Sequence, residues 1–371
     1  MPRDIVTEKN FSLSALLGKI LSYTVLIAWV LITILPLFWL GYSSFKSNGE
    51  LTRDIFAWPH DLFDNYNDQY EVIAPQLNVV PDYDTDTDTR ERLIIESSTI
   101  APGRRLMVHF LVKEDLPPEI AALKPGDTLT LSQLPDKMRR HISWKTIWFN
   151  YESAFERGGL GFKFLNSILY TTVSTFFIIF LGLMAAFGFS KMPFKKLSAV
   201  LMALIGFGYL ISQHQVIIPL FLMYSSVNLT DTHIGIIIAY IAFGLPISVL
   251  LTTQFMRGLP SSLIESAKID GASTFRSFIS IIAPMCKPVM VTVGIISALG
   301  IWNEFLMVLV LASTDATKSL PVGVYSFSSL TGTQLGWQLA ALVIATAPTM
   351  VVYFSFQRQL TRGVVGGAIK G

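Results

Sequence analysis

The chain has 371 residues, of which 51% are hydrophobic and only 15% are charged, and its mean hydropathy is +0.52. Soluble domains carry charge on about 25% of their residues, so this composition argues against an ordinary soluble enzyme. The single cysteine, Cys286, excludes an intrachain disulfide and a cysteine-cluster metal site. The net charge of +2 gives no indication of nucleic-acid binding.

Six apolar segments are long enough to cross a bilayer, since a membrane-spanning helix needs about 20 residues. We expect spans at residues 20–42, 165–189, 197–223, 234–255, 289–311 and 339–356. The first carries no charge and no small-residue cleavage site follows it, so it is interpreted as a retained helix and not as a signal peptide. The third is the least regular, because Ser212, Gln213 and His214 lie within it.

The basic residues of the short connecting segments predict the orientation of the chain. Lys and Arg precede span one, separate spans two and three and spans four and five, and follow span six, whereas the alternate short connections nearly lack them. We therefore expect a multi-pass membrane protein with both termini in the cytoplasm. Residues 1–19 form the N-terminal segment, residues 20–46 contain span one, and residues 144–371 form a core that ends in a cytoplasmic tail, 357–371.

A large acidic segment, residues 47–143, separates spans one and two and is expected to lie outside. Residues 51–143 hold 16 of the 26 acidic residues but only 10 of the 28 basic ones, a net charge of −6. Short apolar runs at 93–95, 106–112 and 128–131 alternate with turn signals such as Pro125-Gly126-Asp127. The sequence thus predicts an all-α membrane bundle of six helices with a small β-rich external insertion.

Four aspartates alternate between Asp82 and Asp88, and alternate carboxylates can converge on a calcium ion. An EF-hand loop also needs glycine at its sixth position and glutamate at its twelfth. Counted from Asp82, those positions hold Thr87 and Leu93, so the motif fails. A solvated acidic loop is the preferred interpretation, and no metal site is predicted anywhere in the chain.

Residues 257–287, between spans four and five, form the most informative segment. Ser262 and Glu265 have the spacing of a capping box, which predicts the start of a helix. Gly271 can take the left-handed conformation that ends it, and Ser273 can cap a second short helix. The pattern predicts two surface helices joined by a tight turn. Capping and turn preferences alone leave open whether these helices dock a partner or only cover the end of the helical bundle.

The same segment resembles the EAA loop of ABC importer permeases, which has the form E-A-A, three residues, G, nine residues, I-x-L-P. The residues that stand at this spacing are Glu265, Ser266, Ala267, Asp270, Gly271, Ile281 and Pro284. Ser266 and Ala283 depart mildly from the pattern. The end of the chain, with Gln357-Arg358 and the final GGAIKG, resembles the smaller maltose-type sugar permease, and the resemblance covers about 1–60 and 148–371.

The resemblance implies a fold, a location in a bacterial inner membrane, partners and residue roles. In such importers the loop forms coupling helices that dock on a separate ATPase, with Glu265 as a polar contact, Gly271 as the turn and Ala267 permitting close packing. The implied partners are a second homologous permease, two ATPase subunits that bind ATP and Mg, an external solute-binding protein and the lipid membrane, with no nucleic acid. The implied cargo is a carbohydrate or oligosaccharide.

Trp302, Asn303 and Glu304 match the same branch of the family and are candidates for the substrate path. An ionisable residue within a span is costly and often functional, so Glu304 either faces the path, pairs with a neighbouring helix or lies at a water-reachable level. Asn303 and Trp302 can contact a sugar by hydrogen bonding and ring stacking. Alternatively, Trp302 belongs to the aromatic belt of the membrane interface.

No sequence pattern indicates catalysis by this chain. It has no G-x-x-x-x-G-K-[ST], no H-E-x-x-H and no G-x-S-x-G. We therefore expect no catalytic, cofactor-binding or metal-binding residue here, and ATP hydrolysis by a separate subunit. Two other classes stay open: a membrane-anchored sensor whose external insertion binds a ligand, and a membrane enzyme.

Overall fold

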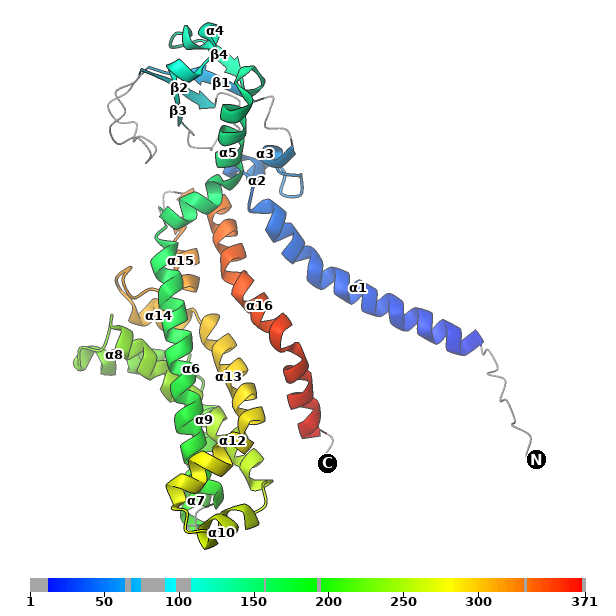
Figure 1. The fold of residues 1–371 in the computed structure, drawn as a ribbon, viewed down its shortest axis with the longest axis vertical. Coiled ribbons are helices and arrows are strands. Elements are labelled where there is room, and N and C mark those ends of the chain that lie inside the picture. Colours follow the sequence, from blue (N-terminus) through cyan, green and yellow to red (C-terminus); the bar gives the residue numbers. More distant parts are fainter. Residues whose placement is uncertain are drawn as a thin grey trace. The chain divides into compact units, whose positions relative to one another are not determined.

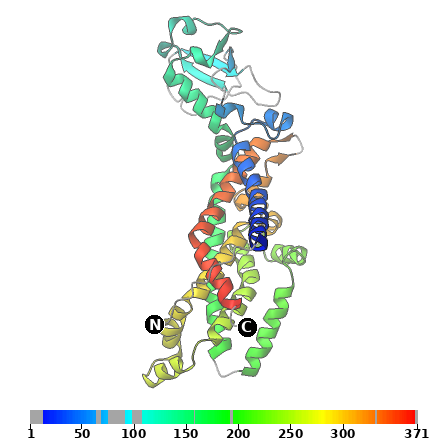
Figure 2. The same ribbon diagram turned by 90° about the vertical axis from the view of Figure 1, so that its right-hand side faces the viewer.

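The computed structural model describes residues 13–63, 68–74, 91–97, 108–156, 158–191, 195–329 and 332–368. The chain forms two compact units (Figures 1 and 2). The first comprises Met1–Asn150 and Leu335–Val343, and the second comprises Tyr151–Gln334 and Ile344–Gly371. The aspartates at 82–88 lie outside the described residues.

The first unit begins with α1 (Leu13–Ser43), a helix that carries no charged residue after Lys19. Its segment Leu17–Ser43 is long and apolar enough to cross a membrane, and the first predicted span, residues 20–42, falls within it. The described part of the chain buries none of its most apolar 18-residue window. A helix that is apolar all round and remains uncovered by its own chain requires lipid or another chain around it.

Two short helices, α2 (Asn48–Arg53) and α3 (His60–Phe63), follow α1. Ser47 and Glu50 form a capping box at the start of α2. The Ser47 side chain accepts a hydrogen bond from the Glu50 backbone N–H at 3.3 Å, and Glu50 accepts one from the Ser47 N–H at 2.7 Å. Such reciprocal bonds satisfy backbone donors that a helix start otherwise leaves unpaired.

A four-stranded antiparallel sheet lies in the insertion, with the order β3-β2-β1-β4 (Figure 1). Its strands are β1 (Gln69–Val72), β2 (Arg92–Ser97), β3 (Val108–Val112) and β4 (Thr128–Thr130). Alternate residues face one core because successive strand side chains point to opposite faces. This core contains Tyr70, Leu93, Ile95, Leu111 and Leu129. The predicted strand at 93–95 falls within β2, and that at 128–131 overlaps β4. The predicted strand at 106–112 overlaps β3, with residues 106 and 107 outside the described part of the chain, and β1 was not predicted.

Helices cover the core of this sheet and carry the chain onward. Ile120 of α4 (Pro118–Ala121) and Ile142 of α5 (Asp136–Glu156) join the buried cluster. Two 3-10 turns, η2 (Lys113–Asp115) and η3 (Leu131–Gln133), follow β3 and β4 and precede these two helices. α5 runs through the predicted end of the insertion at residue 143 without a break.

The second unit is built around α6 (Leu160–Lys191) and α9 (His233–Arg257), which pack side by side. Their interface is close because small residues stand at it. A Cβ on Gly182 would lie 2.1 Å from the Ser248 Oγ, and Ser248 donates a hydrogen bond to the Ile178 carbonyl at 3.0 Å. Small residues and hydroxyl bonds of this kind are typical of packed membrane helices.

The remaining elements of the second unit follow in chain order. They are α7 (Lys195–Leu210), α8 (Ile217–Ser226), α10 (Ser262–Ile269), α11 (Thr274–Ser277), the π-helical turn η4 (Phe278–Ile282), α12 (Ala283–Met285), α13 (Lys287–Trp302), α14 (Leu306–Leu311), α15 (Leu320–Tyr325), the strands β5 (Ser328–Ser329) and β6 (Gly332–Thr333), and most of α16 (Leu335–Ala368). α10 lies at one end of α6 and α9, and α15 lies at the other (Figure 1).

Two predicted spans differ from the structure. In the described residues, four helices are long and apolar enough to cross a membrane, or five if the pair Thr274–Met285 and Lys287–Trp302, bent by 72°, is one span. The predicted third span is not one helix: α7 ends at Leu210 and α8 begins at Ile217. Between them, Gln215 accepts a hydrogen bond from the Ser212 N–H with its side chain. Polar side chains that bond the local backbone in this way compete with the helix.

The predicted fifth span is also interrupted. α13 ends at Trp302, and α14 begins four residues later at Leu306. The Glu304 carboxylate accepts a hydrogen bond from the Met307 N–H at 2.8 Å and thereby satisfies a donor at the start of α14. The predicted spans at 165–189, 234–255 and 339–356 fall within α6, α9 and α16.

Candidate functional site

The segment 257–287 forms the predicted helix–turn–helix, but its start differs from the prediction. α10 begins at Ser262, and the residue before it, Ser261, makes no side-chain cap. The Glu265 N–H bonds the Ser261 carbonyl at 3.2 Å as an ordinary helical bond. The predicted capping box of Ser262 with Glu265 is therefore wrong, because Ser261 already has helical dihedral angles. The Glu265 side chain is exposed at the surface of α10.

Gly271 ends α10 as predicted. Its φ is +78°, in the left-handed region that glycine adopts without a steric penalty. The following residue closes the end of the helix, because the Ala272 N–H donates to the Ala267 carbonyl at 2.8 Å. A Cβ on Gly271 would meet nothing within 4 Å, so the dihedral angle, and not space, requires glycine here.

The second helix also begins as predicted. The Ser273 side chain accepts a hydrogen bond from the Arg276 N–H at 3.2 Å and caps α11. A π-helical turn and α12, which contains the exposed Pro284, then lead into α13. A π turn often marks a functional distortion of a helix, and here it precedes the 72° bend into α13.

α10 presents two different faces. Ile264 and Ala267 are buried within this chain. Glu265, Ser266 and Asp270 are exposed.

Exposed apolar side chains accompany these polar ones on both sides of the turn. Ile269 is 86% exposed and Phe275 on α11 is 66% exposed, while Lys268 and Arg276 are exposed beside them. Uncovered apolar side chains rimmed by charges are typical of a protein–protein contact. The sequence reasoning did not single out Phe275, although a phenylalanine four residues after a turn glycine on a polar surface segment was the available signal.

A hydrogen bond ties this segment to α6. The ammonium group of Lys191, the last residue of α6, donates to the Leu259 carbonyl at 2.6 Å. Beside it, the Phe187 ring lies 5.0 Å from that of Phe278 in the π turn. The base of the helix–turn–helix is therefore held by both a polar and an aromatic contact.

The three candidate path residues lie at the junction of α13 and α14 and have different surroundings. Trp302 is buried, donates from its indole N–H to the Ala345 carbonyl at 3.0 Å, and packs edge-on against Phe164. Glu304 pairs with a neighbouring helix, since its carboxylate accepts a hydrogen bond from the Tyr240 hydroxyl of α9 at 3.1 Å. Asn303 is exposed.

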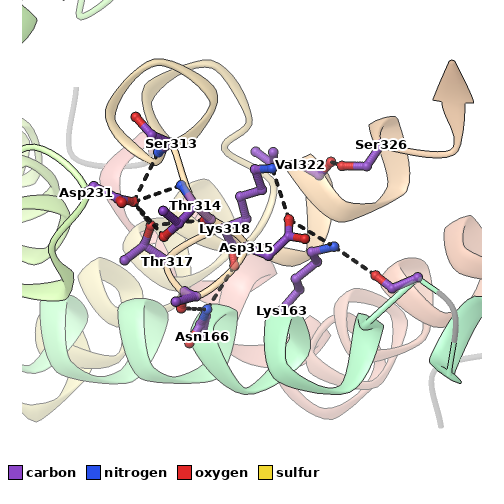
Figure 3. Close-up of polar contacts among 12 residues, drawn as sticks. Lys163, Asn166, Asp231, Ser313, Thr314, Asp315, Thr317, Lys318, Val322 and Ser326 are labelled. Atoms are coloured by element: carbon purple, nitrogen blue, oxygen red, sulfur yellow. Dashed lines mark hydrogen bonds and ion pairs between the residues drawn. The ribbon is translucent and has the colours of Figure 1, made fainter. Parts of the chain in front are cut away.

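The connection between α14 and α15 contains a polar cluster that the sequence did not predict (Figure 3). Asp231, which precedes α9 and has a φ of +55°, accepts hydrogen bonds with one carboxylate oxygen from the Ser313 N–H and the Thr314 N–H, both at 3.1 Å. The hydroxyl of Thr317 also donates to that oxygen. This bond is the largest cause of the lowered pKa of Asp231, and burial opposes it.

Side chains from the first turns of α6 hold the same connection from another side. Asn166 donates to the carbonyls of Ala316 and Lys318 at 2.7 and 3.0 Å. The ammonium groups of Lys318 and Lys163 lie 2.9 and 3.6 Å from the Asp315 carboxylate, and they lower the pKa of Asp315, the hydrogen bond from Lys318 having the largest effect. The connection is therefore cross-linked to both α6 and the start of α9.

These features define a multi-pass membrane protein with a surface helix–turn–helix at one end of its helical unit. In the described part of the chain, no group of three His, Cys, Asp or Glu residues is placed to hold a metal ion. A family model described as "Binding-protein-dependent transport system inner membrane component" matches residues 178–366. The chain therefore belongs to that family, and it is a transport subunit whose family relies on separate ATPase subunits.

Individual relatives agree with this assignment. The trehalose transport system permease protein SugB of Mycobacterium tuberculosis (strain CDC 1551 / Oshkosh) is 32% identical over 67% of this chain and 89% of SugB. The alpha-glucoside transport system permease protein AglG of Rhizobium meliloti (strain 1021) is 30% identical over 69% of this chain and 73% of AglG. The fold is similar to that in a crystal structure of a bacterial ABC transporter involved in the import of the acidic polysaccharide alginate. The TM-score is 0.62 at 16% identity, over 94% of this chain and 98% of that one.

Proposed function

We propose that this chain is the permease subunit of an ATP-driven importer that takes up a carbohydrate or oligosaccharide by alternating access. The observation that carries the proposal is the helix–turn–helix of α10 and α11, whose turn requires Gly271 and whose exposed face combines Glu265 with Ile269 and Phe275. A surface of this kind suits a rigid docking contact. The sugar permeases among the relatives, for trehalose and alpha-glucosides, support a carbohydrate cargo.

The proposed topology has six membrane crossings. α1, α6, α9 and α16 supply four, α13 with its bent entry supplies the fifth, and the interrupted pair α7 and α8 supplies the remaining one. Both termini then lie in the cytoplasm and the insertion lies outside, in accord with the basic residues of the connections. The sheet domain of residues 69–130 faces the external space in this arrangement.

The proposed mechanism couples ATP-driven closure of two ATPase subunits to the membrane helices. An ATPase subunit, which binds ATP and Mg, contacts Glu265, Ser266, Asp270 and the apolar side chains beside them. Because Lys191 and the π turn fix the docking segment to α6 and α13, a displacement of α10 is passed to the spans. Pro284 helps to fix the geometry of the entry to α13.

The proposed assembly contains a second homologous permease, two ATPases and an external solute-binding protein. Asn303 is the candidate for direct sugar contact, since its side chain is exposed where α13 ends. Trp302 and Glu304 support that position through their bonds to α16 and α9. The cross-linked connection 313–319 provides a rigid external surface for the binding protein.

The proposal is tested by uptake of radiolabelled sugar into proteoliposomes that contain the complete importer. Gly271→Pro and Glu265→Lys should abolish ATP-coupled uptake while the chain still inserts into the membrane. Glu119→Lys, on an exposed residue of the insertion, is the matched charge control and should leave uptake intact. Uptake that survives both docking-segment changes would overturn the proposed coupling.

A further inference from the structure

The loop between α2 and α3 exposes three large apolar side chains within four residues. We name residues 54–58 the α2–α3 loop. Ile55, Phe56 and Trp58 are 49%, 71% and 61% exposed. An apolar patch of this density on a short loop is unfavourable in water and indicates a partner. The loop leads from the end of α1 toward the sheet domain, so that partner lies at the base of the insertion.

The loop is fixed in place by polar contacts to the end of α1. The indole N–H of Trp39 donates to the Ile55 carbonyl at 3.0 Å, and the Tyr42 hydroxyl donates to the Phe56 carbonyl at 3.2 Å. The ammonium group of Lys46 donates to the Ile55 carbonyl at 2.8 Å. With its carbonyls held by α1, the loop is constrained to present its apolar side chains outward.

Asp54 shapes the start of the same loop. Its carboxylate accepts hydrogen bonds from the Phe56 and Ala57 N–H groups at 2.9 and 3.2 Å. This arrangement satisfies backbone donors locally, as an aspartate commonly does in turns. The exposure of the apolar side chains is therefore a consequence of an ordered turn.

Aromatic rings make the loop continuous with the surface of α1. The Trp58 ring lies 5.0 Å from that of Tyr42 and 6.1 Å from that of Phe38. Phe38 is 58% exposed and lies on α1, whose most apolar 18-residue window has no residue buried by the described part of the chain. On α5, Trp144 is 64% exposed and its ring lies 5.6 Å from that of Trp148. Tryptophan and tyrosine gather at the level where a membrane span meets the headgroups.

We propose that the α2–α3 loop is a membrane-interface anchor, which places Ile55, Phe56 and Trp58 among the headgroups and upper acyl chains of the bilayer beside the end of α1. The occupant is lipid, because the patch continues the apolar surface of a helix that itself spans the bilayer. The anchor fixes the level at which the chain leaves the membrane for the sheet domain. The inference requires only that α1 is a membrane span, and it is independent of the cargo.

The experiment measures the depth of a nitroxide label by electron paramagnetic resonance. Ala57→Cys places the label inside the loop, where Ala57 is exposed, and leaves the three apolar side chains intact. The complete importer is reconstituted in lipid nanodiscs, and the label's accessibility to oxygen is compared with its accessibility to a water-soluble nickel chelate. The native Cys286 is buried, and the unsubstituted chain, treated with the same reagent, measures any background labelling.

Two reference positions calibrate the depth. A label at Leu31→Cys, on the exposed surface of α1, should be more accessible to oxygen than to the nickel chelate. A label at Lys124→Cys, on an exposed turn of the sheet domain, should be more accessible to the nickel chelate. We expect the label at residue 57 to fall between them, on the oxygen side. Combined Phe56→Ser and Trp58→Ser changes should make the label at residue 57 more accessible to the nickel chelate and less accessible to oxygen. A label as nickel-accessible as that at 124, or one shielded from both reagents by protein, would overturn the proposal.

Discussion

The ammonium group of Lys191 lies 2.6 Å from the carbonyl oxygen of Leu259, across 68 residues of sequence. The bond joins the last residue of α6 to the segment that precedes α10. The bond does not involve the exposed side chains of α10, so removing it tests the proposed transmission of movement separately from the proposed docking contact.

We expect Lys191→Met to reduce ATP-coupled uptake several-fold while the ATPase still binds, because methionine retains the apolar stem but removes the donor. Lys195→Met is the matched control, since Lys195 is exposed at the start of α7 and carries the same charge near the same helix end. Uptake and ATPase activity are measured on the same proteoliposomes, so that a loss of coupling can be told from a loss of ATP hydrolysis. Equal uptake by the two variants would refute a transmitting role for Lys191.

The Asp231 carboxylate should make stability depend on pH at the acid end. Its pKa is lowered in the folded protein, so its contribution is present above the unfolded value of about 3.9 and is lost as the pH falls through the lower folded value. Asp231→Asn tolerates the positive φ but weakens the bonds to Ser313, Thr314 and Thr317. We expect a loss of about 1–2 kcal/mol at pH 7.

Thermal unfolding of the purified chain in detergent, measured from pH 3 to pH 7, checks this expectation. The difference in Tm between the native chain and Asp231→Asn should be largest near neutral pH and shrink on acidification. A difference that is constant with pH would show that the charge of Asp231 does not stabilise the connection.

Gly182 and Gly188 on α6 offer a matched pair of substitutions. A Cβ at 182 would collide with the Ser248 side chain, whereas a Cβ at 188 meets nothing within 4 Å. Gly182→Ala should therefore cost about 1–3 kcal/mol through overpacking against α9. Gly188→Ala should be neutral or stabilising by up to about 1 kcal/mol, because alanine is the better helix former. Similar Tm values for both variants would contradict the close α6–α9 contact.

The bond between Tyr240 and Glu304 is tested by a double-mutant cycle. Tyr240→Phe and Glu304→Gln should each destabilise the chain by about 1 kcal/mol. The double variant should lose less than the sum, because both changes remove the same interaction. Thermal unfolding supplies the values, and strict additivity would show that the two side chains do not interact in the folded protein.

The sequence predicted the features that depend on short-range pattern. Apolar runs located α1, α6, α9 and α16, and the spacing around Gly271 located a turn whose φ is positive. The β1 strand was missed, because the polar Gln69 and Glu71 leave no apolar run in its four residues. The capping box was assigned to Ser262 because spacing alone cannot tell whether a serine precedes a helix or already has helical dihedral angles.

The site features that escaped prediction are contacts between distant segments. Asp231 meets Thr317 86 residues later, and no local pattern around an isolated aspartate indicates that partner. At the interruption of the fifth apolar run, Glu304 likewise meets Tyr240, 64 residues away. Hydrophobicity alone treats such a run as continuous, because its composition stays apolar on both sides of the break.

The proposed function depends on docking of a separate ATPase by the α10–α11 segment. Affinity purification of this chain from its native membrane in mild detergent, with identification of every co-purifying polypeptide, tests that docking. We expect an ABC ATPase, a second permease and a solute-binding protein, with the ATPase lost from the Glu265→Lys chain but retained by the Glu119→Lys control. Recovery of the folded chain without an ATPase in several detergents would contradict it.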